Sequence, residues 1–257
     1  MIKPFYASCL LALTLLTPSL VKANPTASQY QQILNENLAE NEPGVSVIIS
    51  KNGKVLFKGT RGLANLEHNI ALNEQSVLRL GSISKQFTAA AIMMLQEQGK
   101  LAVTDDIHKY VASFPTEGNI VTIENLLTHT SGIANYTDDD DLFDKEIQVP
   151  TSVDDTLTRF AKHPMVFKPG EAMAYSNTGY SLLGKIIEVA SGQPYKDFIE
   201  QHIFKKLKMN QSSYEGQEIV AHRASGYEQT EQGFINTSYI NMDWPYAAAR
   251  LYLRQPT

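Results

Sequence analysis

The sequence predicts an α+β protein of the α/β-sandwich type. Two β-branched runs come early, within residues 44–59, and helical patterns come later, at 82–98, 177–189 and 195–207. Chains that place strands before helices in this way form α+β folds, in which helices cover an antiparallel sheet. With 257 residues, 43% of them hydrophobic, the chain is long enough to build such a core.

The N-terminal residues 1–23 predict a signal peptide. Lys3 precedes a short apolar run, and small residues then lead to Ala23. This pattern is typical of exported proteins, so we expect cleavage after Ala23 and a secreted or periplasmic mature domain at 24–257. The apolar run is short for a bilayer span, so we expect membrane attachment only if the segment stays uncleaved. Cys9 is the only cysteine, so the mature chain depends on no disulfide.

After a short helix expected at 30–38, residues 44–59 predict a β-hairpin. Its two runs flank Asn52 and Gly53, a pair that tolerates the positive φ angles of a two-residue type I′ turn. We therefore expect the two runs to pair antiparallel across this turn.

Helical periodicity marks the longer elements that follow. At 82–98 apolar residues recur at three-and-four spacing, and Gly99 follows as a stop signal. The pattern at 177–189 is closed by Gly192, and another helix is expected at 195–207.

Two shorter segments lie between these helices. Residues 122–133 predict a helix capped by Thr122, with Asn125 at its third position, that breaks at Gly132. The four aspartates at 138–141 predict a solvated polar connection, because the glycine and glutamate that an EF-hand calcium loop requires are absent.

The candidate chemistry begins in the stretch LGSISKQFT, where Ser82 and Lys85 lie three residues apart at the start of a helix. A serine in the first turn has its Oγ near backbone N–H groups and the positive helix end, which favour a developing negative charge. Lys85 lies on the same face, where a desolvated amine can act as a base or steer one through hydrogen bonds. The same spacing also arises by chance, from an N-cap serine and a solvated lysine.

A second element is the triplet Tyr-Ser-Asn, which places Tyr175 and Asn177 after a Pro-Gly turn and at the start of a helical pattern. A phenol beside Lys85 can shuttle a proton from Ser82, and an amide can hold both the lysine and a substrate carbonyl. The Tyr-Ile-Asn triplet at 239–241 lacks that turn and that helix, so we predict a structural role for it.

Three segments together carry a resemblance to a known family: LRLGSISKQFTAAAIMMLQEQGKL, TIENLLTHTSGI and KPGEAMAYSNTGYSLLGKIIEVASG. They are similar to the penicillin-recognising serine hydrolases, which include class C β-lactamases, D-alanyl-D-alanine carboxypeptidases, D-aminopeptidases and some esterases. The resemblance covers roughly residues 45–248. It implies a β-lactamase/penicillin-binding-protein transpeptidase-like fold: an antiparallel sheet flanked by helices, a helical lobe, and the site between them. It also implies acyl-enzyme chemistry without a metal or cofactor, on a cell-wall peptide, a β-lactam or an ester.

The resemblance implies a role for each of four residues. Ser82 would be the acylated nucleophile, and its backbone N–H would be one oxyanion donor. Lys85 would accept the serine proton or act as partner of the base. Tyr175 would be the base that also activates the deacylating water, and Asn177 would contact the substrate amide. The sequence leaves open which of Lys85 and Tyr175 holds the proton at rest, because the two titrations are coupled.

The family's third motif is Lys or His followed by Thr/Ser-Gly on a late strand, and no such triplet follows Tyr175. We therefore expect a chain truncated before that motif, with its C-terminal strands missing. Residues 250–257 depart from the family pattern, which leads to the hypothesis of a frameshift. The rival to a serine hydrolase is then a catalytically inactive pseudoenzyme or a chain that binds peptidoglycan peptides.

Other functional classes have little support. The net charge of −5 and the lack of a basic stripe argue against nucleic acid as a partner. The six histidines show no paired ligand spacing, which argues against a metal site. No G-x-S-x-G is present for an α/β-hydrolase nucleophile. We expect His129 to support the site from a helix exit. The oligomeric state is left open.

Overall fold

The computed structural model describes residues 25–216 and 218–253, so the predicted signal peptide at 1–23 lies outside the described residues. The α-helices are α1 (Ala27–Asn37), α2 (Ser84–Glu97), α3 (Ile123–Leu127), α4 (Asp140–Lys145), α5 (Val153–Phe160), α6 (Asn177–Ser191), α7 (Tyr195–Ile199) and α8 (Tyr246–Ala249). The strands are β1 (Val45–Lys51), β2 (Lys54–Arg61), β3 (Leu63–Asn65), β4 (Ile70–Ala71), β5 (Leu78–Arg79), β6 (Ser213–Tyr214), β7 (Tyr227–Thr230), β8 (Gly233–Asn236) and β9 (Leu251–Leu253).

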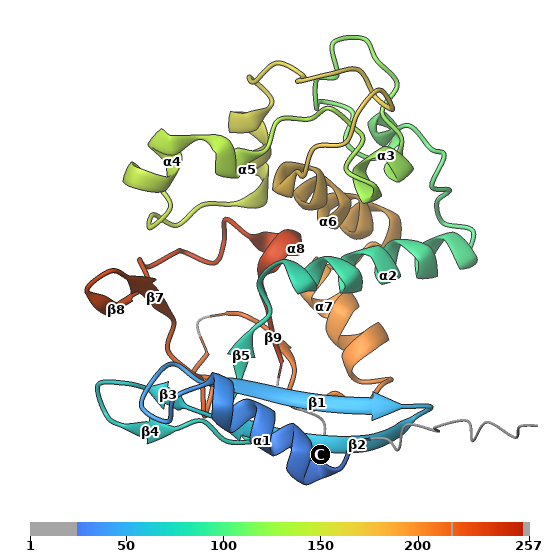
Figure 1. Ribbon diagram of the computed structural model, residues 1–257. Helices are drawn as coiled ribbons and strands as arrows, with labels where there is room; N and C mark the ends of the chain where they lie inside the picture. The colour runs from blue at the N-terminus through green and yellow to red at the C-terminus, as the bar shows by residue number, and fades with distance from the viewer. Residues whose placement is uncertain (1–24, 217, 254–257) are drawn as a thin grey trace, which may run out of the picture.

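The elements are arranged between a hairpin end and a helical end. Figure 1 shows β1, β2 and α1 at one end, helices α3 to α6 at the other, and α2, α7 and α8 between them. All strand pairs within the described residues are antiparallel. The predicted α+β class, with antiparallel strands and a helical lobe, is therefore confirmed.

The predicted hairpin forms as expected. Strands β1 and β2 pair antiparallel, and Asn52 and Gly53 adopt φ angles of 51° and 74°, as a type I′ turn requires. Helix α1 packs on β2, where the rings of Tyr30 and Phe57 lie 5.5 Å apart. Among the described residues, β1 and β2 pair only with each other.

A second small sheet connects distant parts of the chain. Strand β9 lies between β5 and β6, with Leu78 opposite Leu253 and Tyr252 opposite both Arg79 and Ser213. Because β5 leads directly into the segment of Ser82, this sheet fixes where that segment begins.

The main core lies between α2, α6, α7 and α8. Its fully buried side chains include those of Ile92, Leu95, Leu182, Leu183, Ile186, Ile187, Tyr195, Phe198 and Ala248. Helix α8 approaches α6 closely at Gly184, where a Cβ atom would lie 2.4 Å from Cε1 of Tyr246 and 2.5 Å from Cβ of Ala247. Glycine at this position therefore permits the close approach of the two helices.

The structure changes two predictions for the helices that carry the motifs. The helix predicted from residue 82 begins at Ser84, and a single 3₁₀ turn at Gly81–Ile83 precedes it. The helix capped by Thr122 has the predicted capping box, but it ends at Leu127, well before Gly132.

Two further boundaries also differ. The loop predicted at 138–141 is wrong, because Asp139 caps α4 and two aspartates form its first turn, although Asp138, Asp140 and Asp141 are exposed as expected. That helix forms because Leu142 buries its side chain in a small core with Trp244. The helix predicted at 195–207 is α7 followed by a π-helical turn at Glu200–Phe204.

Candidate active site

Ser82 lies in the 3₁₀ turn between β5 and α2, and its side chain is exposed. Two backbone links hold this turn. Leu80 N–H donates to the carbonyl of Leu251 at 2.9 Å, and Leu251 N–H donates to Oγ of Ser84 at 3.2 Å. The position of Ser82 is therefore set by β9 as well as by its own helix.

Tyr175 and Lys85 both reach the Ser82 hydroxyl. Ser82 Oγ and Tyr175 Oη share a hydrogen bond of 2.5 Å, and Lys85 Nζ donates to Ser82 Oγ at 3.4 Å. The Lys85 ammonium also lies over the Tyr175 ring, 4.6 Å from its centroid. The three groups that the sequence singled out for proton transfer are thus in mutual contact.

The Lys85 amine has two further partners, and both are pure acceptors. Nζ donates to Oδ1 of Asn177 at 2.7 Å and to the carbonyl of Ala248 at 3.0 Å. A neutral amine has two N–H groups and one lone pair, so with these acceptors satisfied its lone pair can face Ser82. In the ammonium form the third N–H donates to Ser82 Oγ.

Burial lowers the pKa of Lys85 from 10.5 to about 8. Among the described residues no carboxylate forms a salt bridge with Lys85 to oppose this shift. The lysine can therefore exchange a proton near neutral pH, as a base partner must.

Asn177 is the first residue of α6, which Ser176 caps through its side chain. Besides binding Lys85, Asn177 donates from Nδ2 to Oγ1 of Thr137 at 3.2 Å, and its backbone N–H donates to Oδ1 of Asn135 at 2.9 Å. The resemblance implied a contact with the substrate amide. The observed contacts hold Asn177 against the lysine, and the contact with a substrate amide stays a prediction.

His129 contacts the same group of side chains. Its ring packs on Tyr175 and Tyr180, with centroids 4.6 and 5.1 Å apart. Burial, and secondarily the charge of Lys85, lower the pKa of His129. The expectation that it supports the site agrees with this position.

Sequence reasoning did not find the carbonyl contacts from α8. Oγ1 of Thr88 donates to the carbonyl of Ala247 at 2.7 Å, while Lys85 binds that of Ala248. A backbone acceptor has no signature in residue type, so no pattern could have shown it. Tyr239 is exposed and takes part in none of the contacts of Ser82 or Lys85.

The described residues contain no group of three or more His, Cys, Asp or Glu side chains arranged to hold a metal ion. In the same part of the chain, every helix is too short or too polar to cross a bilayer.

The fold and the sequence together place the chain in a family of serine hydrolases. The Beta-lactamase family matches residues 29–253, and the chain belongs to this family.

One curated relative and two solved structures are named as penicillin-binding proteins or as a homologue of one. Penicillin-binding protein 4* of Bacillus subtilis (strain 168) is 33% identical over 211 residues, which cover 77% of this chain and 45% of the relative. The octameric penicillin-binding protein homologue from Pyrococcus abyssi is 31% identical with a TM-score of 0.74, covering 88% of this chain and 53% of that one. The penicillin-binding protein from Bacillus halodurans is 29% identical with a TM-score of 0.71, covering 81% and 65%. The chain spans about half the length of the curated relatives it matches.

Proposed function

We propose that this chain is an exported serine hydrolase that forms an acyl-enzyme at Ser82. Its proposed substrates are D-Ala-D-Ala-type peptides, β-lactams or related esters. The observation that carries the proposal is the shared contact of three groups: Tyr175 Oη lies 2.5 Å from Ser82 Oγ, and the buried Lys85 amine lies 3.4 Å from it.

Acylation follows from these contacts. Ser82 Oγ attacks the substrate carbonyl carbon, and its proton passes to the Tyr175 oxygen or to the neutral Lys85 amine. The Oγ–carbonyl bond forms while the amide or ester bond breaks, and the held proton goes to the leaving group. The N–H of Ser82, in a turn whose first N–H groups have no intrahelical partner, faces the developing oxyanion.

Deacylation requires a water molecule and the same base. Tyr175 is 43% exposed, so water can reach its hydroxyl from the open side of the site. Tyr175 takes a proton from that water, which attacks the acyl carbon, and the Ser82 oxygen leaves with the proton. To accept that proton the tyrosine oxygen must first carry a negative charge, and the Lys85 ammonium over the ring stabilises this charge until the proton arrives.

The substrate class and export rest on separate support. The relatives named as penicillin-binding proteins favour β-lactams and the peptides that β-lactams mimic. Export is supported by the charged, apolar and small-residue sequence of residues 1–23. N-terminal sequencing of the processed protein should begin at Asn24, and an unprocessed start at Met1 would contradict cleavage.

A fluorescent penicillin and intact-protein mass spectrometry test the proposal. We expect one adduct per chain, absent from Ser82→Ala and retained in Ser28→Ala, whose hydroxyl lies on the exposed helix α1. An adduct that survives in Ser82→Ala would contradict the assignment. A chain that forms no adduct at all would favour the alternative, an inactive peptide-binding chain.

A further inference from the structure

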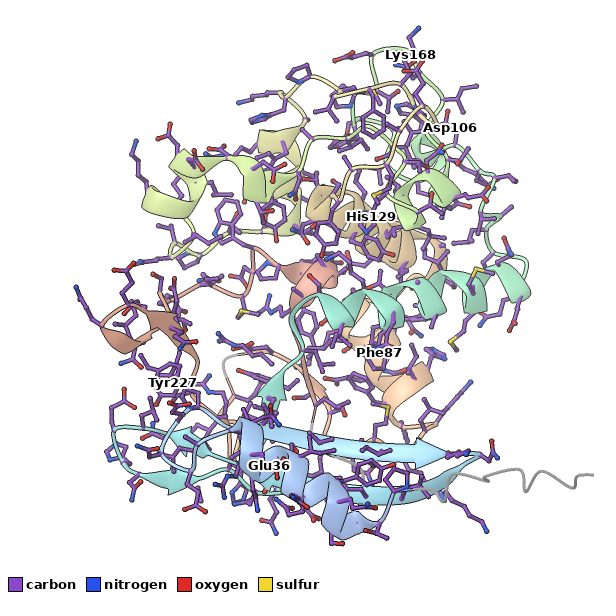
Figure 2. All side chains as sticks on the ribbon, viewed as in Figure 1. Glu36, Phe87, Asp106, His129, Lys168 and Tyr227 are labelled. Atoms are coloured by element: carbon purple, nitrogen blue, oxygen red, sulfur yellow. The ribbon has the colours of Figure 1, made fainter. Side chains whose placement is uncertain are left out.

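The His129 imidazole occupies a central place that the proposed proton transfers do not use. Figure 2 labels His129 in the helical part of the molecule, beside α6, and its side chain is partly buried. Its backbone has a φ of 59°, in the left-handed region, and its carbonyl accepts a hydrogen bond from Ala174 N–H at 3.0 Å. The loop after α3 is thereby tied to the residue just before Tyr175.

The imidazole holds Tyr175 in two ways. Its ring lies against the phenol ring at 4.6 Å, and its Nδ1 accepts a hydrogen bond from Ser176 N–H at 3.1 Å. The imidazole also packs on Tyr180, whose hydroxyl donates to the carbonyl of Leu127 at 3.1 Å. Because that bond fixes the Tyr180 ring, the His129 ring, which contacts both tyrosines, sets the position of the Tyr175 ring.

This arrangement requires the neutral imidazole. A protonated Nδ1 carries a hydrogen and can no longer accept from Ser176 N–H, so the bond would become a contact between two donors. The charged and titratable groups that face the ring are Lys85 from α2, Tyr175 before α6 and Tyr180 on α6. Lys85 carries the positive charge among them, and it opposes a second cation.

We propose that His129 is a positioning residue for Tyr175, and that only its neutral form keeps the phenol hydroxyl on Ser82. Protonation of His129 breaks its hydrogen bond with Ser176 N–H and loosens its contact with the Tyr175 ring, so the Tyr175 hydroxyl loses its hydrogen bond with Ser82. This role rests on the proposed function for its effect on acylation, but the placement of Tyr175 can be measured without catalysis.

Two substitutions separate the parts of this role. His129→Asn keeps an acceptor atom near Nδ1 and tolerates the left-handed backbone, but it cannot gain a proton. His129→Phe keeps a ring and loses the acceptor. The control is His163→Asn, which removes a histidine stacked on Phe160 at 5.1 Å.

The first measurement is the rate of penicillin labelling against pH. Below the Lys85 titration near pH 8, we expect the wild-type rate to fall by a further factor of about 3 to 10 as His129 gains its proton, the usual worth of one hydrogen bond. His129→Asn should lose this lower step and keep the one near pH 8, and His163→Asn should keep both. His129→Phe should be slow at every pH. A lower step that persists in His129→Asn would overturn the proposal.

The second measurement is the nuclear Overhauser contact between the Tyr175 ring and the Ser82 methylene hydrogens. In the wild type it should be present at pH 8 and lost as the His129 imidazole titrates, while in His129→Asn it should persist. A contact that survives the wild-type titration would overturn the proposal even if labelling is normal. A contact that titrates in a chain without any labelling would leave the positioning role intact and contradict the hydrolase function.

Discussion

Replacing Gly184 on α6 by alanine should disturb the candidate site through α8, whose Ala248 carbonyl binds Lys85. The added Cβ would lie 2.4 Å from the Tyr246 ring and 2.5 Å from Cβ of Ala247, whereas ordinary contacts lie at 3.4–4 Å. Helix α8 must therefore retreat by about 1 Å to restore normal contacts. Its Ala248 carbonyl, now 3.0 Å from Lys85 Nζ, would then lie at the limit of a hydrogen bond or beyond.

The size of both effects follows from these contacts. Overpacking costs about 1–3 kcal/mol, and the better helix propensity of alanine offsets about 1 kcal/mol of this, so Gly184→Ala should lower the unfolding free energy by about 0–2 kcal/mol. A lost hydrogen bond to a charged group is worth about 1.5–3 kcal/mol, so acylation should slow by roughly 10-fold or more.

Urea unfolding and the rate of penicillin labelling measure these two quantities. The matched control is Gly179→Ala on the same helix, where the added Cβ would meet Leu126 and Ser176 at an ordinary 3.7 Å. We expect the control to be as stable as the wild type or slightly more stable, with an unchanged labelling rate. Equal stability and equal labelling for Gly184→Ala would refute the argument that this close approach sets the lysine.

Two other substitutions test the proton-transfer groups. Lys85 is charged below about pH 8 in the folded chain and below about 10.5 in the unfolded chain, so the unfolded chain binds more protons between these values. The unfolding free energy of the wild type should therefore rise with pH across this window relative to Lys85→Met, and parallel curves from urea titrations would contradict the buried lysine. Tyr175→Phe should slow turnover of a reporter substrate by roughly 10²-fold or more, while Tyr239→Phe leaves it unchanged. Equal losses in the two phenylalanine variants would show that proton transfer was assigned to the wrong tyrosine.

Local patterns predicted the hairpin and the approach of Lys85 to Ser82. The turn at Asn52 and Gly53 needs only two residues that accept positive φ, and one turn of helix brings Lys85 to the face of Ser82. The approach of Tyr175 to Ser82 was implied by the family resemblance of the motifs, since no local pattern joins positions so far apart.

The features missed by sequence reasoning depend on tertiary packing. The four charged aspartates at 138–141 favoured a loop prediction. The segment is helical because the next residue, Leu142, buries its side chain, and this burial could not be read from the aspartates. The Ala248 carbonyl has no signature in residue type, and the small side chain of Gly184 acquires meaning only beside α8.

The hydrogen bond from Lys85 on α2 to the carbonyl of Ala248 on α8 also has a consequence for synthesis. Lys85 and its acceptor Ala248 are 163 residues apart in the chain. At typical elongation rates of 5–20 residues per second, a nascent chain carries the serine and lysine for about 10–30 s before α8 appears. During that interval the lysine is hydrated and holds its proton firmly, so Ser82 is a poor nucleophile. Reactivity towards penicillin should therefore appear only when α8 docks, and stalled nascent chains that stop before residue 246 should remain unlabelled.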